Sequence, residues 1–250
     1  MAPESEGSRL RRREISARHS QGKTMTIESK RAKLVAMLKQ PTAAMSKLLA
    51  EQKERCRDLA RPDFIWYFLL QSFATMGNSR GWRGLMGTPA NYNRVTFDAL
   101  AQLNPKERAE MTSLVMSQAK VRLPQRKAGW LAENFDLVQG MGGLEGAKRL
   151  ALAQPGTRAK TAFMKGFRGI GDKYARNIWM DVYHPDFHET IAVDERIKRV
   201  SEAIGCTFRN YSSHEQFYLD AAHEAGIQGW ELDRLLYNFR DIFLDGLREA

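Results

Sequence analysis

A glycine-rich turn in the second half of the chain has residue types suited to binding phosphate. Gly169 and Gly171 flank one apolar residue, Ile170, between a helical segment that ends near Gly166 and another that begins near Asp172. Glycine permits positive φ and the close approach of another chain. Ile170 can turn inward and pin the turn to both helices. The first amides of the second helix would then face outward, where a helix start binds a phosphate oxygen well.

Two chemically active side chains follow this turn. Lys173 lies in the first turn of the second predicted helix, and Asp194 follows the apolar run 191–193 just before another predicted helix. A lysine attacks carbon only as the neutral amine, and the positive end of a helix dipole disfavours its cation. Asp194 is suited to capping the helix that it precedes. Its charge can also stabilise a positive charge that develops in a transition state.

These residues resemble a motif of the helix–hairpin–helix (HhH-GPD) DNA glycosylase superfamily. The run Phe163–Ala175, which contains the Gly-Ile-Gly turn and Lys173, is similar to the hairpin usually written LPGVGxxTA. The run Thr190–Val200 is similar to the TIAVDTHIFRV signature of endonuclease III-type enzymes, with Asp194 in register. The resemblance covers the chain from about residue 62 to 205 and implies an all-α, two-lobed fold with a DNA cleft between the lobes.

The sequence departs from that pattern in two ways. Phe167-Arg168 stands where the hairpin usually has leucine-proline. Cys56 and Cys206 are the only cysteines, too few for an iron–sulfur cluster, and they are expected to be buried free thiols. The 8-oxoguanine glycosylase branch also lacks the cluster and is similar in its lysine and aspartate, so the branch stays open.

The resemblance implies a bifunctional DNA glycosylase and AP lyase. Lys173 would attack C1′ of the sugar, expel a damaged or modified base and leave a Schiff base, from which β-elimination cuts the strand. Asp194 would stabilise the oxocarbenium-like charge. No cofactor is required and no metal site is expected, and a monovalent cation at the hairpin stays open. The substrate would be double-stranded DNA with a flipped-out base. An oxidised base is favoured, and oxidised purines, oxidised pyrimidines and modified bases of foreign DNA all stay open.

Several other side chains are expected to contact the DNA. An apolar wedge fills the gap that a flipped base leaves, and in the resembled enzymes such a residue stands at the position of Leu123. The loop after a central helix at 64–73 reads the opposite base in those enzymes; Asn78, Arg80 and Trp82 are its candidates, with capping or core packing as the alternative. Phosphate contacts are expected from a set of glycines and basic side chains: Gly169, Gly171, Lys165, Arg168, Arg122, Arg126 and Lys127.

The C-terminal helix carries aromatic residues that could hold the flipped base. They include Trp230, Tyr237 and Phe243. Aromatic residues at helical spacing are more often part of the core, so they are expected to be buried.

Bulk properties are consistent with a DNA-binding protein. The chain has 250 residues and a formal net charge of +10, which favours polyanionic partners. The longest apolar run, 64–70, is too short to cross a bilayer, and no secretory signal is visible. We expect a monomer in the cytoplasm, associated with the nucleoid.

Helical spacing of apolar residues predicts helices throughout most of the chain. Residues 1–29 read as a flexible basic tail. Residues 62–186 would form a helical barrel that ends in the helix–hairpin–helix, and residues 30–61 would join 187–250 in a second lobe. Individual helices are predicted at 64–73, 96–102, 106–120, 125–138, 144–153 and 157–166.

Three alternatives to the bifunctional enzyme stay open. A monofunctional glycosylase would use Asp194 and water, with Lys173 idle. A non-catalytic helix–hairpin–helix protein would only bind DNA. A basic RNA-binding or ribosome-associated protein is the third.

Overall fold

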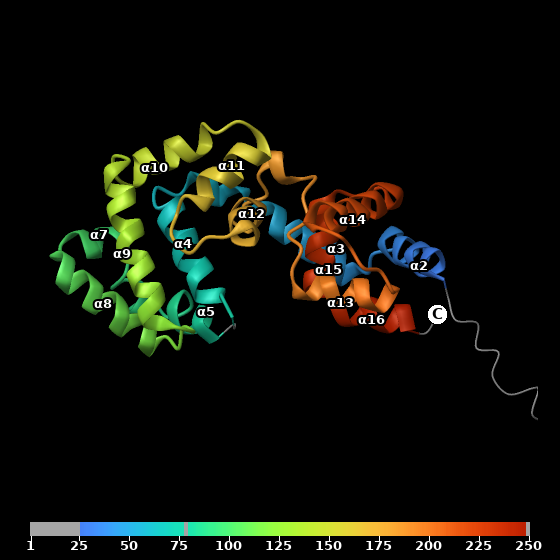
Figure 1. Cartoon of the computed structure of the whole chain (residues 1–250), viewed down its shortest axis with the longest axis horizontal. Coiled ribbons are helices and arrows are strands. Elements are labelled where there is room, and N and C mark those ends of the chain that lie inside the picture. Colours follow the sequence, from blue (N-terminus) through green and yellow to red (C-terminus); the bar gives the residue numbers. More distant parts are fainter. Residues whose placement is uncertain (1–25, 78–79, 249–250) are drawn as a thin grey trace, which may run out of the picture.

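The computed structural model describes residues 26–77 and 80–248, and within these ranges every regular element is helical. The predicted all-α class is therefore confirmed. The helices gather into two groups side by side, which we call the hairpin lobe and the terminal lobe (Figure 1).

The hairpin lobe contains the middle of the chain. The pairs α8–α9 and α11–α12 pack against each other, and α4 contacts α5, α10 and α12. Its helices are α4 (Phe64–Thr75), α5 (Arg80–Leu85), α6 (Pro89–Tyr92), α7 (Phe97–Ala101), α8 (Pro105–Gln118), α9 (Pro124–Gly140), α10 (Gly143–Leu152), α11 (Gly156–Lys165) and α12 (Asp172–Asp181).

The terminal lobe joins the two ends of the described chain. The helix α14 packs on α2, α13 on α16, and α15 on α3. Its helices are α2 (Ile27–Lys39), α3 (Ala43–Lys53), α13 (Glu195–Ile204), α14 (Tyr211–Ala225), α15 (Gly229–Asn238) and α16 (Arg240–Arg248).

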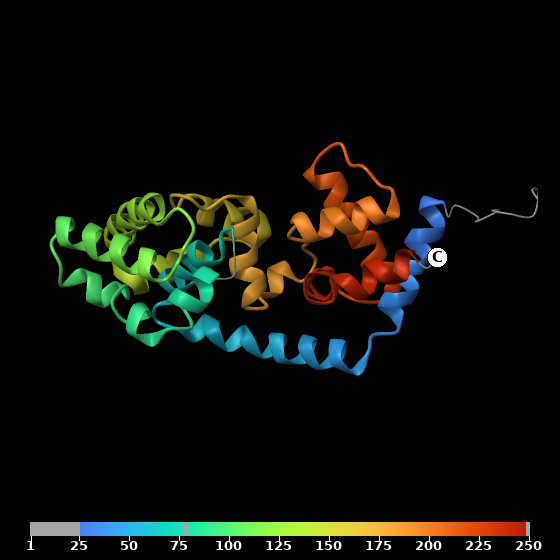
Figure 2. The same ribbon diagram turned by 90° about the horizontal axis from the view of Figure 1, so that it is seen from below.

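Two chain segments connect the lobes. The helix α3 continues into the 3₁₀ helix η1 (Glu54–Ala60) and runs along one side of both lobes (Figure 2). The return passage, from the end of α12 to α13, contains the short 3₁₀ helix η2 (Pro185–Phe187). The junction is therefore crossed twice, and the second crossing leads directly to Asp194.

The core of the hairpin lobe is built on α4. Most of its side chains are buried, as expected for a helix that is apolar on nearly all faces. The indole of Trp66 donates a hydrogen bond to the carbonyl of Val95 at 2.8 Å, and Phe97 stacks on Phe135. The prediction of a central buried helix at 64–73 is confirmed.

Some local boundaries differ from the predictions. The loop expected at 78–82 gives way to α5 at Arg80, because Gly81 lacks the Cβ atom that would clash with the carbonyl oxygen of Ala74 and so lets α5 pack tightly against α4. The helix α2 begins at Ile27, before the predicted end of the tail. Cys56 is exposed and Cys206 only partly buried, so the expectation of two buried thiols was wrong.

Candidate active site

The turn between α11 and α12 has the predicted hairpin geometry. Ile170 is buried, and it lies between a helix that ends at Lys165 and one that begins at Asp172. Gly169 adopts φ +84°, and a Cβ atom there would overlap the Trp130 ring. Both the backbone conformation and the packing therefore require glycine at position 169.

A buried asparagine fixes the backbone of this hairpin. The Asn134 side chain on α9 accepts a hydrogen bond from the amide of Arg168 at 2.7 Å and donates one to its carbonyl at 3.0 Å. This two-bond contact holds the first half of the turn, where Phe167-Arg168 replaces leucine-proline. Sequence reasoning missed Asn134, although a polar residue among the core-facing positions of an amphipathic helix was a usable signal.

The second glycine leaves an open surface at the start of α12. Gly171 has an ordinary φ of −97°, and a Cβ atom there would meet nothing within 4 Å. As the N-cap residue it offers no side-chain acceptor to the first-turn amides. These amides and the open surface form a helix start of the kind that binds anions.

The structure brings Lys173 and Asp194 together across the junction of the lobes. Lys173 Nζ lies 3.6 Å from Asp194 Oδ2, with the lysine side chain 37% exposed and the aspartate 10% exposed. The other oxygen, Oδ1, accepts hydrogen bonds from the amides of Arg196 and Ile197 at 2.8 and 3.2 Å. The predicted N-cap is thus confirmed, and one carboxylate makes both contacts with separate oxygens.

Side chains from the terminal lobe hold the extended segment that leads to Asp194. The amide of Ile191 donates to Glu215 at 3.0 Å, and the amide of Ala192 donates to Asp233 at 2.9 Å. Tyr211 accepts from the amide of Val193 and donates to the carbonyl of Ile191. The segment 191–193 therefore has a fixed path without belonging to a helix or a sheet.

An aromatic side chain lies exposed near this pair. Tyr237 on α15 is 43% exposed, and the guanidinium of Arg196 lies 3.7 Å from the centre of its ring. The expectation that Tyr237 belongs to the core was wrong, whereas Trp230 and Phe243 are buried as predicted. Tyr174, the neighbour of Lys173, is partly buried, and burial raises the pKa of its hydroxyl.

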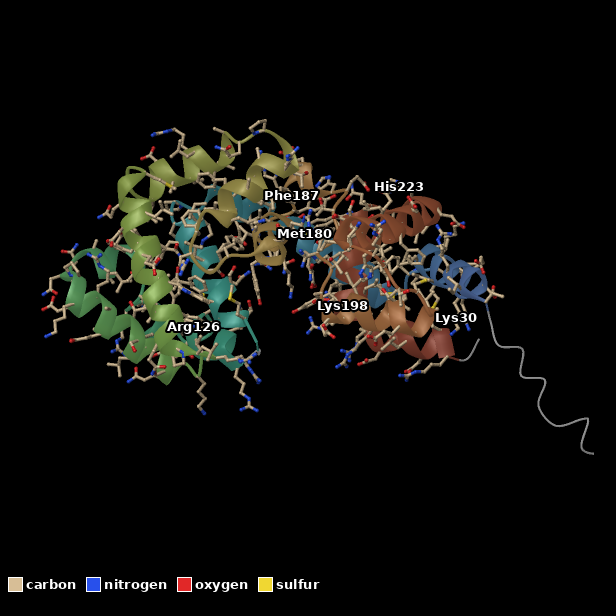
Figure 3. The ribbon with its side chains drawn as sticks, viewed as in Figure 1. Lys30, Arg126, Met180, Phe187, Lys198 and His223 are labelled. Carbon is tan, nitrogen blue, oxygen red and sulfur yellow. The ribbon has the colours of Figure 1, made fainter. Side chains whose placement is uncertain are left out.

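Most of the predicted phosphate-binding side chains are exposed on the hairpin lobe. Lys165 pairs with Asp172 at 2.7 Å, and Arg168 lies 3.6 Å from Glu133. Arg126 lies in the first turn of α9 (Figure 3). The exposed members of the predicted set are Lys165, Arg168, Arg122 and Arg126.

Lys127 does not belong with these exposed residues, and its predicted phosphate contact was wrong. Its ammonium group is buried and donates hydrogen bonds to the carbonyls of Phe73 and Met76 at the end of α4. Burial and the nearby Arg122 lower the pKa of Lys127 to about 8. Its side chain instead caps the end of α4, where carbonyls lack helical partners.

The two predicted base-contacting regions differ in shape. Leu123 precedes α9 in a left-handed conformation, φ 57° and ψ 54°, with 51% of its surface exposed. Arg80 and Trp82 are exposed on α5. Asn78 lies outside the described residues. An apolar side chain held outward by a backbone conformation unusual for leucine is the geometry expected of a wedge.

Residues 26–77 and 80–248 contain neither a candidate metal site nor a candidate membrane span. No group of three or more His, Cys, Asp or Glu side chains there could hold a metal ion. No helix in this part of the chain is long and apolar enough to span a membrane.

Comparison with solved structures identifies the fold. The chain is similar to the 8-oxoguanine DNA glycosylase of Methanocaldococcus jannaschii, with a TM-score of 0.57 and 14% identity over 84% of this chain and 92% of that one. It is equally similar to the Thermotoga maritima 8-oxoguanine DNA glycosylase Tm1821, with a TM-score of 0.57 and 17% identity over 84% and 96%. No family model and no curated protein matches the sequence. The chain thus shares its all-α fold with these two 8-oxoguanine DNA glycosylases.

Proposed function

We propose that this protein is a DNA glycosylase that excises a damaged base by attack of Lys173, and that it also has AP lyase activity. The observation that carries the proposal is the Lys173–Asp194 pair, with 3.6 Å between Nζ and Oδ2, beside an open hairpin. The fold, shared with two proteins described as 8-oxoguanine DNA glycosylases, supports it. 8-Oxoguanine is accordingly the first lesion to test.

The chemistry begins at C1′ of the damaged nucleotide. As the bond between C1′ and the base breaks, positive charge develops on the sugar, and the Asp194 carboxylate stabilises it. The neutral amine of Lys173 forms a bond to C1′, and the base leaves with the bonding electrons and takes up a proton. The sugar ring then opens: the C1′–O4′ bond breaks, O4′ keeps the bonding electrons and takes up a proton, and the nitrogen lone pair forms the double bond of a protonated imine. The imine makes the 2′ hydrogen acidic, and its removal expels the 3′ phosphate.

The DNA would lie across the junction of the lobes. The amides at the start of α12 would bind one backbone phosphate, and Lys165, Arg168 and Arg126 would contribute charge. Leu123 would occupy the gap in the stack, and Tyr237 offers a ring on which an extruded base can stack. Neutralisation of several phosphates makes the affinity fall steeply with salt.

The Lys173–Asp194 ion pair also favours a second candidate, a monofunctional glycosylase. In an ion pair the lysine is the protonated partner, and a protonated amine cannot attack carbon. In that case Asp194 would activate or orient water, and Lys173 would only stabilise the carboxylate. The bifunctional enzyme requires that DNA binding separate the pair and leave the amine neutral.

One experiment distinguishes these activities. Duplexes that carry 8-oxoguanine, an oxidised pyrimidine or an undamaged base are incubated with the protein, and each is analysed with and without alkali. Base release with strand cleavage in the absence of alkali supports the bifunctional enzyme, and release with cleavage only after alkali supports the monofunctional one. Absence of base release from every duplex, with binding retained, would overturn both in favour of a non-catalytic DNA-binding protein.

A further inference from the structure

Helix α15 contacts both chain segments that carry the Lys173–Asp194 pair. At the end of α12, the indole of Trp230 donates a hydrogen bond to the carbonyl of Met180 at 2.7 Å, near the junction of the lobes (Figure 3). Towards the extended segment, Asp233 accepts from the amide of Ala192 at 2.9 Å. Helix α15 therefore contacts both α12, which contains Lys173, and the segment that leads to Asp194.

Arg234 connects these two contacts. Its Nη1 atom lies 3.2 Å from Oδ1 of Asp181, the last residue of α12, and its Nε atom lies 3.8 Å from Oδ2 of Asp233. Gln71 of α4 donates a hydrogen bond to the other oxygen of Asp181 at 2.8 Å. The guanidinium thus links Asp181 of α12, the helix that begins with Asp172 and Lys173, to Asp233, whose carboxylate holds the segment that ends in Asp194.

The buried charges of Arg234 and Asp233 are only partly satisfied by hydrogen bonds. Arg234 and Asp233 are buried, and Arg234 Nε and Nη2 have no hydrogen-bond partner among the described residues. Burial raises the pKa of Asp233 to about 6, against the opposing effect of Arg234. A buried ionic cluster with unsatisfied donors is generally no more stable than apolar packing of the same volume, and its known benefit in some proteins is a single defined arrangement.

We propose that Arg234 is a positioning residue that sets the distance between Lys173 and Asp194. It binds Asp181 on α12 and lies beside Asp233 of its own helix, which accepts from the Ala192 amide of the other segment. Arg234 and Asp233 together therefore fix the two segments relative to each other where the lobes meet. The inference rests on the proposed function of that pair. Because a displacement of about 1 Å can lower the rate of an enzyme roughly 100-fold, loss of Arg234 should reduce the chemical step more than it reduces DNA binding.

The test compares Arg234→Met with a matched control, Arg108→Met. Arg108 is also a largely buried arginine; it donates to the carbonyls of Leu100 and Leu103, and its guanidinium lies 3.7 Å from the centre of the Phe135 ring. It lies on α8, with no contact to the candidate pair. Each variant is assayed at a temperature at which its unfolding curve shows it fully folded. The two measurements are the single-turnover rate of base release and the dissociation constant for a duplex with a non-cleavable abasic analogue.

We expect Arg234→Met to lower the single-turnover rate by about tenfold or more, with a dissociation constant close to that of the wild type. Arg108→Met should change neither value. A wild-type rate in Arg234→Met, or an equal loss in both variants, would overturn the positioning role. So would a loss of DNA affinity as large as the loss of rate. An inactive wild-type protein would instead count against the proposed function.

A second readout does not depend on activity. Amine-reactive labelling followed by mass spectrometry gives the rate of modification of Lys173 relative to Lys165 in the same molecule. Separation from Asp194 should make Lys173 more reactive in Arg234→Met and leave it unchanged in Arg108→Met. Equal Lys173 labelling in the wild type and Arg234→Met would overturn the proposal even for a protein without glycosylase activity.

Rescue by a conservative change tests the Asp233 half of the connection. In Asp233→Asn the side-chain oxygen can still accept from the Ala192 amide, whereas Asp233→Leu removes the acceptor. We expect Asp233→Asn to keep a higher single-turnover rate than Asp233→Leu when both are folded. Equal rates in the two variants would show that the bond to Ala192 has no positioning effect.

Discussion

The carboxylate of Asp194 makes two contacts with different oxygens. Oδ2 lies 3.6 Å from Lys173 Nζ, and Oδ1 accepts the amides at the start of α13. The helix cap therefore fixes the orientation of the oxygen that faces the lysine. Because the two contacts use different atoms, substitutions can separate the structural contribution of the residue from the chemical one.

Lys173→Gln should abolish covalent trapping. The amide of glutamine is not nucleophilic, so borohydride would find no imine to reduce, although the side chain is of similar length. The measurement is the yield of the protein–DNA complex on a denaturing gel after treatment with borohydride. Lys47→Gln is the matched control, because Lys47 is an exposed lysine on α3 that pairs with Glu51 and has no assigned contact with DNA. Trapping of Lys173→Gln at the wild-type yield would assign the nucleophile to another residue.

Asp194→Asn should leave the stability nearly unchanged and greatly reduce the rate. Asparagine caps helices about as well as aspartate does, so α13 keeps its start. The negative charge that faces the sugar is lost, and base release should slow by about 100-fold or more. Asp194→Ala removes the cap as well and should lower the free energy of unfolding by about 1 kcal/mol. Chemical denaturation and single-turnover assays of both variants check this, and a wild-type rate in Asp194→Asn would contradict it.

The parts of the site that depend on local sequence were predictable. The hairpin follows from Gly169 and Ile170, and the cap from an aspartate placed before a helix. In each case the residues that make the structure are neighbours in the chain. The helices from α7 to α11 were also predicted, because their apolar residues recur at helical spacing and tertiary contacts do not override it.

Features that depend on distant contacts were not predictable. Lys127 was expected to face phosphate, but its side chain reaches the end of α4, a contact between residues about fifty positions apart. Asp194 and Arg234 are likewise far apart in the chain, because the helices α13 and α14 lie between Asp194 and α15. A charged pair, Asp233-Arg234, among the leucines of α15 was a signal of a buried ionic cluster, but the sequence does not identify its partners.

Substitution of the two hairpin glycines by alanine should affect two different properties, the stability of the fold at position 169 and the affinity for DNA at position 171. Gly169→Ala should destabilise the fold by roughly 1–3 kcal/mol, because position 169 requires positive φ and a Cβ atom would overlap Trp130. Gly171→Ala should fold normally, since its φ is ordinary and the space is open, but its methyl group would obstruct a phosphate at α12. Thermal unfolding and DNA titration measure the two effects. Unchanged affinity in Gly171→Ala would argue against a phosphate at this helix start.

Leu123→Gly should separate stability from activity at the wedge position. The left-handed conformation of Leu123 costs about 1–2 kcal/mol, which glycine avoids, although glycine also gains freedom in the unfolded chain. We therefore expect a free energy of unfolding equal to that of the wild type or up to about 1 kcal/mol higher. Base release from duplex DNA should slow by about tenfold, because nothing apolar fills the gap. A lesion in single-stranded DNA is the control, since its base is already unstacked, and equal slowing there would contradict a wedge.

Asp233→Asn should change how stability depends on pH. Burial raises the folded-state pKa of Asp233 from 3.8 to about 6, so the wild-type folded state binds a proton that the unfolded chain releases near pH 4. This contribution favours the folded state at low pH and is lost as the pH rises from about 4 to 6. The variant lacks it, so its stability relative to the wild type should rise across that window, by at most about 3 kcal/mol.

Urea unfolding of both proteins at several pH values between 4 and 7 measures this difference. Asp172→Asn is the control of opposite sign, because the hydrogen bond from Lys165 lowers the pKa of Asp172. The charged form of Asp172 therefore stabilises the fold at neutral pH, and that stability is lost as the pH falls through its folded-state pKa. The stability of Asp172→Asn relative to the wild type should thus decrease as the pH rises to about 5, just above the unfolded-state pKa, and should stay nearly constant above that pH. A difference between Asp233→Asn and the wild type that stays constant from pH 4 to 7 would show that Asp233 is ionised in the folded protein throughout this range.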